Sequence, residues 1–130
     1  MLRISADARA GSMGDLGIAT TPDANASFWN ASKIPFAQTK SALGITYTPW
    51  LKSLGLNDVY LVTSAGYHKF SETQALSASL RYFNLGTIQF TDFAGNNLNV
   101  SRPREWSLDA AYSRALSNKL GVAIALRFIY

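Results

Sequence analysis

The segment Lys119–Tyr130 reads Lys-Leu-Gly-Val-Ala-Ile-Ala-Leu-Arg-Phe-Ile-Tyr. Large apolar residues stand at every second position, and the positions between them hold mainly small residues and Arg127. Successive side chains of a β-strand point to opposite faces, so one face of this segment is apolar and the other is mostly small. A strand of a membrane barrel needs about 9–11 residues, with lipid on one side and the lumen on the other. The segment therefore predicts a strand of that kind.

The same two-residue period recurs along the chain, and no window shows a sustained 3.6-residue apolar stripe. The other segments with this period are Ser41–Trp50, Asp58–Lys69, Gln74–Leu85, Glu105–Arg114 and the shorter Thr87–Phe93. We predict an all-β fold, an antiparallel transmembrane β-barrel of which this chain supplies about five or six strands. The serines expected to face its lumen are Ser64, Ser77, Ser79 and Ser113.

Composition agrees with a barrel strand pattern and excludes several other classes. Apolar residues make up 48% and charged residues 15% of 130 residues, below the roughly 25% charge of soluble domains. No apolar run reaches the roughly 18 residues of a transmembrane helix. Cysteine is absent, which excludes disulfides and thiolate metal sites. The net charge of +4 comes from scattered residues, so we expect no nucleic-acid partner.

The connections between the predicted strands alternate in length. Leu51–Asn57 and Gly86–Arg104 are long, whereas Phe70–Thr73 and Ala115–Asn118 are short. Bacterial barrels have short periplasmic turns and long outer loops, so we expect the long connections outside. Within the second long connection, Gly95-Asn96-Asn97 is typical of the turn of an extended hairpin.

Aromatic residues also follow this orientation, because amphipathic rings favour the two boundaries between lipid and water. The residues predicted at the outer ends are Trp50, Tyr60, Tyr82, Trp106 and Phe128, and those near the inner ends are Tyr67 and Tyr112. The alternative is that these rings cap the core of a soluble sheet. The smallest usual barrels have about eight strands, so we expect further strands to follow in a longer gene product.

The N-terminal forty residues differ in kind from the rest. Small residues dominate, and Thr21 followed by Pro22 predicts a helix start, with short helical turns over Ala24–Ser32. We expect residues 1–40 to form a hatch, a plug inside the barrel mouth, and residues 41–130 to form the strands. The alternatives are a linker or a small packed lobe. The start of the chain lacks a secretory signal, which indicates a mature form or a piece of a longer product.

The hatch sequence carries a resemblance. The run from Gly11 to Thr20, then Pro22–Asn25 and Phe28–Lys33, resembles the N-terminal signature of FadL-like outer-membrane barrels and, within them, of PorV-like proteins of the type IX secretion system. Further runs that match in order are Leu2–Arg9, Tyr47–Leu51, Ala75–Phe83, Gly86–Asp92, Tyr112–Arg114 and Val122–Tyr130. The hatch motif residues are Gly11, Met13, Gly14, Asp15, Gly17, Pro22, Asp23, Trp29 and Asn30. The chain departs from the pattern at Ala31, where the superfamily usually has proline.

The resemblance implies a barrel of about fourteen strands in the outer membrane of a Gram-negative bacterium, with the hatch on the periplasmic side. It implies that the protein binds secreted cargo at the translocon and passes it to surface attachment. Its partners would be cargo proteins, other secretion-system barrels and the lipid bilayer. Alternatives are a FadL-type channel for hydrophobic small molecules and a lipid-modifying outer-membrane enzyme.

Individual side chains give expectations about chemistry. Apolar and aromatic residues dominate contact energies, so the expected cargo contacts of the outer loops are Leu54, Leu56, Phe90 and Phe93. The charges expected to face the lumen are Arg81, Asp109 and Arg127, with Asp109 paired to either arginine. His68 is the single histidine, and no cluster of metal ligands or catalytic triad can be assembled. We expect no enzyme activity, metal or cofactor.

Overall fold

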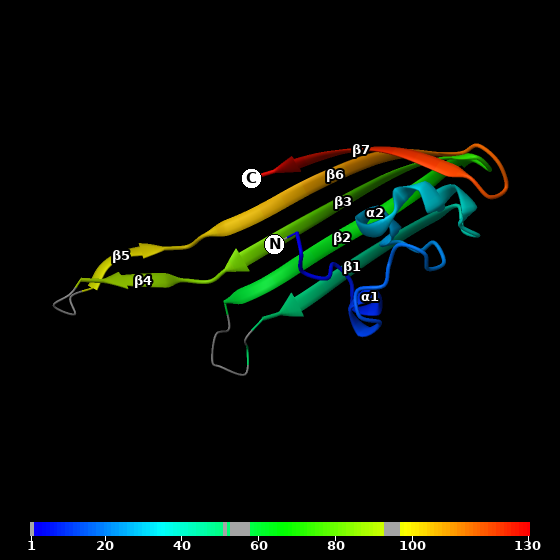
Figure 1. Cartoon of the computed structure of the whole chain (residues 1–130). Coiled ribbons are helices and arrows are strands. Elements are labelled where there is room, and N and C mark those ends of the chain that lie inside the picture. Colours follow the sequence, from blue (N-terminus) through cyan, green and yellow to red (C-terminus); the bar gives the residue numbers. More distant parts are fainter. Residues whose placement is uncertain (1, 51, 53–57, 93–96) are drawn as a thin grey trace.

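A computed structural model describes residues 2–50, 52, 58–92 and 97–130 (Figure 1). Its main element is a five-stranded antiparallel sheet in the order β1-β2-β3-β6-β7. The strands are β1 (Ser41–Pro49), β2 (Val59–Ser71), β3 (Gln74–Leu85), β6 (Arg104–Ala115) and β7 (Gly121–Ile129). This confirms the predicted all-β, antiparallel class. The sheet is not closed within the described residues.

A separate two-stranded ribbon projects beyond one end of this sheet (Figure 1). It pairs β4 (Ile88–Thr91) with β5 (Asn97–Ser101). The predicted Thr87–Phe93 includes Thr87 and Asp92, which lie outside β4, and Phe93 lies outside the described residues. A hairpin was expected here, but no bounds were predicted for its second strand, and Asn97, expected in the turn, begins β5. The segment β5 escaped prediction because asparagine, a poor strand former, occupies alternate positions within it. Gly95 and Asn96, expected at the hairpin turn, lie outside the described residues.

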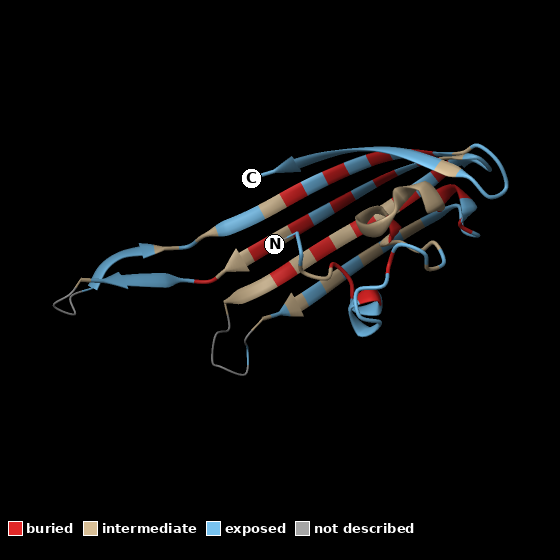
Figure 2. Ribbon diagram, viewed as in Figure 1, coloured by how far each residue is buried: buried red, intermediate tan, exposed pale blue. Residues whose placement is uncertain are grey.

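The strand registers place side chains of the same face in rows across all five strands. One row runs Ile45, Ser64, Leu80, Leu108, Phe128, and the row beside it on the opposite face runs Gly44, Ala65, Ser79, Asp109, Arg127. We call the face of the first row the outer face and the face of the second row the inner face. The alternation appears as stripes along β2, β3 and β6 (Figure 2).

The two faces have the reverse of the distribution found in soluble proteins. On the outer face the relative exposures of Leu43, Ile124 and Leu126 are 74%, 75% and 76%. On the inner face Ser107 and Ser113 are 0% exposed. Large aliphatic residues are normally the buried ones and serine is normally exposed. A row of this kind requires an apolar medium or a partner against the outer face.

The strand β2 corrects two predictions. Ser64 lies on the outer face, opposite Leu80, and does not face inward. Tyr67, expected at a lipid boundary, lies on the inner face and is buried. Both faces of β2 mix large and small residues, so its period alone could not orient it, whereas its pairing with β1 and β3 does. Ser77, Ser79 and Ser113 lie buried on the inner face.

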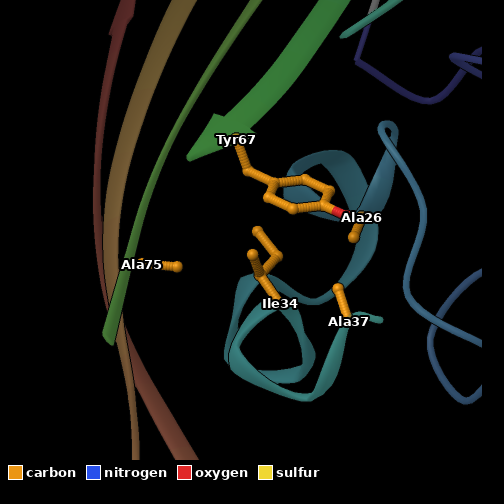
Figure 3. Packing of buried hydrophobic residues seen from close by; sticks show 5 residues of the cluster. All are labelled: Ala26, Ile34, Ala37, Tyr67 and Ala75. Atoms are coloured by element: carbon orange, nitrogen blue, oxygen red, sulfur yellow. The ribbon is translucent and has the colours of Figure 1, made fainter. Parts of the chain in front are cut away.

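The N-terminal segment covers part of the inner face of the sheet. It contains α1 (Ala8–Ser12), α2 (Ala26–Trp29) and the 3₁₀ helix η1 (Ala31–Phe36). Both α2 and η1 pack against β3, with α2 also on β2 and η1 on β6 and β7. A small apolar core between segment and sheet consists of Ala26, Ile34, Ala37, Tyr67 and Ala75 (Figure 3). Small residues predominate in it, which lets the segment lie close to the strands.

The predicted helix start at Thr21 and Pro22 is wrong. Residues 21–23 are irregular, and α2 begins after its N-cap Asn25. The Asp23 carboxylate accepts the backbone N–H of Asn25 at 3.1 Å, and the Asp23 carbonyl accepts that of Ala26 at 3.1 Å. This Asx-type turn satisfies those donors and delays the helix by one turn. Within the described residues, no helix is both long and apolar enough to cross a membrane.

Candidate functional site

Asp7 is the centre of the N-terminal segment. It is 4% exposed and forms the N-cap of α1, accepting the Ala10 backbone N–H at 3.3 Å. The same carboxylate accepts the Trp29 indole N–H at 3.0 Å and the Asn25 amide at 3.5 Å. A charged acceptor makes stronger hydrogen bonds than a neutral one. Asp7 thus connects α1 to α2 across eighteen to twenty-two residues of chain.

Two cations hold the loop between α1 and α2. Arg9 pairs with Asp23 at 2.9 Å and donates to Thr21 Oγ1 at 3.1 Å. The Lys33 ammonium donates to the Gly17 carbonyl at 2.6 Å and to the carbonyl of Thr20 at 3.2 Å. Burial lowers the pKa of Lys33 below its usual range, and the negative charge of Asp23 partly offsets this.

Gly17 packs directly against Trp29. It is buried, and a Cβ at this position would overlap the indole ring. Only glycine permits this approach of the backbone to the ring without a shift. The missing side chain at Gly17 leaves room for the ring, whose N–H donates to Asp7.

Polar contacts from the sheet reach backbone groups of the segment. Thr63 donates to the Ala6 carbonyl, Lys69 to the Ala37 carbonyl at 2.9 Å, and Arg81 to the Leu2 carbonyl at 3.0 Å. The Arg81 guanidinium also lies 4.7 Å from the centroid of the Phe28 ring, a cation–π contact. Arg81 is 5% exposed, so it serves the junction between segment and sheet.

The sequence left two partners open for Asp109, and the structure pairs it with Arg127. The two hydrogen bonds are 2.7 and 2.8 Å long, in the bidentate geometry of a strong arginine–carboxylate pair. Asp109 also accepts from Ser79 at 3.4 Å. Beside this pair lies a pocket of about 230 Å³, lined by Ser27, Ser77, Asp109, Ala111, Ala125, Leu126 and Arg127. The inner face at this point is polar and charged.

The hatch motif residues fall into two groups. Gly17, Asp23, Trp29 and Asn30 lie in the contacts between the helices, whereas Gly11, Met13, Gly14 and Asp15 lie exposed at the end of α1. Pro22 is partly buried and lines a pocket of about 390 Å³ with Phe36. The positive φ of Gly14 and Asp15 marks the turn that ends α1.

Ala31 stands where proline was expected, and hydrogen bonds made by the neighbouring Asn30 support the turn. Asn30 is the N-cap of η1, and its side-chain oxygen accepts the Ser32 backbone N–H at 3.1 Å and the Ser32 hydroxyl at 2.6 Å. Its amide donates to the Ile18 carbonyl at 3.4 Å. The asparagine side chain thus holds the turn in which a proline was expected.

Sequence reasoning missed Asp7, Arg9 and Lys33 as members of the site. A signal for Asp7 was present, because aspartate before Ala8-Arg9-Ala10 fits an N-cap before helix-forming residues. The partners of Arg9 and Lys33 are twelve to sixteen residues away, and no local period reports such contacts.

The expected loop contacts are placed only in part. Leu54, Leu56 and Phe93 lie outside the described residues. Phe90 lies in β4 and is 51% exposed. Other exposed apolar residues of the same ribbon are Ile88, Leu98 and Val100. The ribbon is exposed beyond the end of the sheet (Figure 2). It carries apolar side chains on both of its faces, because Ile88 pairs with Ser101 and Val100 pairs with Gln89.

An aromatic row crosses the outer face near that end. Ring centroids lie 5.7 Å apart for Tyr47 and Tyr60 and 6.2 Å apart for Tyr60 and Tyr82. On β6, the Trp106 ring lies 5.4 Å from Phe128 and 6.0 Å from Tyr130. Trp50, expected in this row, has a different role: it packs edge-on against the inner-face residue Phe83 at 6.3 Å.

His68 lies on the outer face of β2 and hydrogen-bonds Ser41 Oγ at 2.7 Å. Its ring also contacts Phe70 edge-on at 5.4 Å. Across the part of the chain that the structure describes, no three potential metal-ligating side chains come together.

Comparison with known proteins extends over the whole chain. Residues 1–130 match the family described as "Type IX secretion system protein PorV". No curated protein matches the chain.

Proposed function

This chain belongs to the PorV family of type IX secretion system proteins. From that premise we propose that it forms part of an outer-membrane barrel. We propose further that this barrel binds secreted cargo and passes it to surface attachment. In this proposal the outer face contacts lipid. Residues 41–130 supply strands of the wall, and residues 1–40 form a hatch on the periplasmic side. The partners are cargo proteins and other barrels of the secretion system.

The observation that supports this proposal most strongly is the exposure of the outer face. Leu43, Ile124 and Leu126 are about three-quarters exposed, while the inner face carries buried serines and the Asp109–Arg127 pair. Membrane barrels alternate apolar-out and polar-in along each strand. The aromatic row at one end of the outer face fits a boundary between lipid and water.

The open edges of the sheet support a larger wall. The strands β1 and β7 each pair on one side only within the described sheet. Unpaired backbone groups cost several kcal/mol each in lipid, about as much as a lost hydrogen bond in an apolar medium. We therefore expect further strands to pair with both edges in the membrane.

The hatch assignment is supported by the kind of contact it makes. The segment meets the sheet through a small apolar core and through hydrogen bonds from Thr63, Lys69 and Arg81 to its backbone. These contacts place the N-terminal segment against the inner face, where its residues share a core with Tyr67 and Ala75 of the strands.

Cargo contact is supported by the ribbon of β4 and β5. Phe90 and its apolar neighbours are exposed at the end opposite the β2–β3 and β6–β7 turns (Figure 1). The inner face offers little to the alternative of a channel for hydrophobic molecules, because its central rows carry the buried polar residues Ser77, Ser79 and Asp109 and the partly exposed Arg127.

The test is affinity purification of the tagged full-length gene product from its host membrane. We expect cargo protein and a second large barrel to co-purify. Phe90→Ser should reduce the cargo recovered, whereas Leu116→Ser, an equally exposed apolar site in the β6–β7 turn, should not. Recovery of fatty acid without either protein would contradict the secretion role and favour the channel.

A further inference from the structure

A polar pocket lies on the outer face, immediately beyond the aromatic row. It has a volume of about 360 Å³ and is lined by Asp58, Tyr60, Tyr82, Asn84, Gly86, Thr87, Arg102 and Arg104. Tyr60, Asn84 and Arg104 occupy one row of the register across β2, β3 and β6. The next row on this face, toward the middle of the sheet, includes Tyr82 and Trp106. The pocket therefore sits where an outer face of apolar residues ends.

Several of the lining side chains can donate hydrogen bonds. Arg102 and Arg104 bring two guanidinium groups, each a fork of N–H donors that suits phosphate oxygens. The Asn84 side-chain oxygen accepts the Gly86 backbone N–H at 3.3 Å, so its amide nitrogen remains as a donor. The hydroxyls of Tyr60 and Tyr82 can donate as well.

The one carboxylate of the pocket is already engaged. Asp58 accepts the Thr87 backbone N–H at 2.7 Å, and this bond lowers the pKa of Asp58 below its usual range. Gly86 makes the contact possible: its φ is +80°, and a Cβ there would lie 2.9 Å from Asp58 Oδ1. Asp58 thus holds the segment between β3 and β4 in place. Two arginines against one carboxylate leave the pocket cationic.

We propose that this pocket binds the phosphorylated headgroup of a membrane lipid, whose acyl chains lie along the outer face. The inference rests on the proposed membrane function, because it needs lipid against this face. Phosphate would receive the guanidinium N–H groups, while the aromatic row lies beneath at the depth where headgroup and acyl chain join. A free phosphate shares the headgroup's charge but lacks chains, so the outer face would add nothing to its binding.

The test uses native mass spectrometry of the full-length protein in detergent. The probes are lipid A with two phosphates, the same lipid dephosphorylated, and inorganic phosphate. We expect the wild type to prefer the phosphorylated lipid over both other probes. Arg102→Gln with Arg104→Gln should reduce that binding by roughly five- to twenty-five-fold, about fivefold for each arginine near a charged surface.

Arg114→Gln is the matched control, because Arg114 lies on the same strand and the same face as Arg104 but at the opposite end. Its binding should equal that of the wild type. Equal loss in both variants, no preference for the phosphorylated lipid, or equally tight binding of inorganic phosphate would each overturn the proposal. Sedimentation with membranes is measured in parallel. A wild-type protein that inserts but shows no preference for the phosphorylated lipid refutes the pocket alone, whereas failure of the wild type to insert refutes the proposed membrane function.

Discussion

At the scale of single residues, Asp7 shows what sequence can and cannot provide. Its position before α1 could be predicted from capping preferences, whereas its bonds to Asn25 and Trp29 depend on how two short helices fold back together. Gly17 is similar. A glycine in a small-residue stretch is unremarkable by itself, and its contact with Trp29 appears only once the chain is folded.

Asp7→Asn should loosen the N-terminal segment. Both carboxylate oxygens accept hydrogen bonds from N–H groups, and asparagine has only one such acceptor, so its amide would meet a donor. We expect the free energy of opening that protects the α1 amides from exchange to fall by about 1–2 kcal/mol, the usual cost of an unmatched buried polar group. Hydrogen exchange measures this.

Asp15→Asn is the control for that measurement, because Asp15 is exposed and asparagine tolerates its φ of 63°. It should leave exchange in α1 unchanged. If Asp7→Asn were also silent, Asp7 would not hold the segment.

At the scale of elements, the strands with one clearly apolar face were predicted well. The bounds of β3 match the predicted Gln74–Leu85, and those of β6 differ by one residue at each end. The strand β2 could not be oriented, because Val62 and Leu61 are both large and lie on opposite faces. Only the pairing of Ser64 with Ile45 and Leu80 settles the matter.

The Asp109–Arg127 pair should stabilise the contact between β6 and β7. Arg127→Gln leaves the Asp109 carboxylate buried with Ser79 as its remaining partner. We expect unfolding to become easier by about 1–2 kcal/mol, less than for a fully buried pair because Arg127 is 40% exposed. Urea titration in detergent measures the loss.

Two comparisons check that assignment. Arg114→Gln, an exposed site on the opposite face of β6, should leave the urea midpoint unchanged. Adding Asp109→Asn to Arg127→Gln should recover part of the loss, because the unpaired charge disappears. A double variant less stable than Arg127→Gln alone would contradict the pair's role.

The stability of the junction between β3 and β4 should fall at acidic pH. The bond from Thr87 N–H lowers the pKa of Asp58 in the folded protein, so the stability it adds is present above about pH 4, the ordinary range of aspartate, and is lost as the pH falls through the lower folded value. The NMR shift of the Thr87 amide should titrate with Asp58. In Asp58→Asn that titration should vanish; its persistence would mean that another group causes it.

At the scale of the whole molecule, the period of the strands predicted the class of fold but could not predict how the N-terminal segment lies on it. The contacts of Ala6 with Thr63 and of Leu2 with Arg81 span fifty-seven and seventy-nine residues. Such contacts leave no trace in local periodicity. The likeness of the chain to the PorV family, in contrast, was readable from short runs in order along the sequence and is confirmed over residues 1–130.

The central claim is that the outer face contacts lipid and the inner face does not. Ala110 on β6 and Ala125 on β7 form a matched pair: both are exposed alanines, on opposite faces of neighbouring strands at nearly the same height. These 130 residues contain no cysteine, so each introduced thiol is the only one among them.

The most direct measurement labels Ala110→Cys and Ala125→Cys with a small fluorophore in the full-length protein in its membrane, then compares quenching by brominated lipid and by aqueous iodide. We predict that brominated lipid quenches the label at position 110 and leaves the label at position 125 unaffected. Quenching of position 125 by lipid, or of position 110 by iodide alone, would contradict the account.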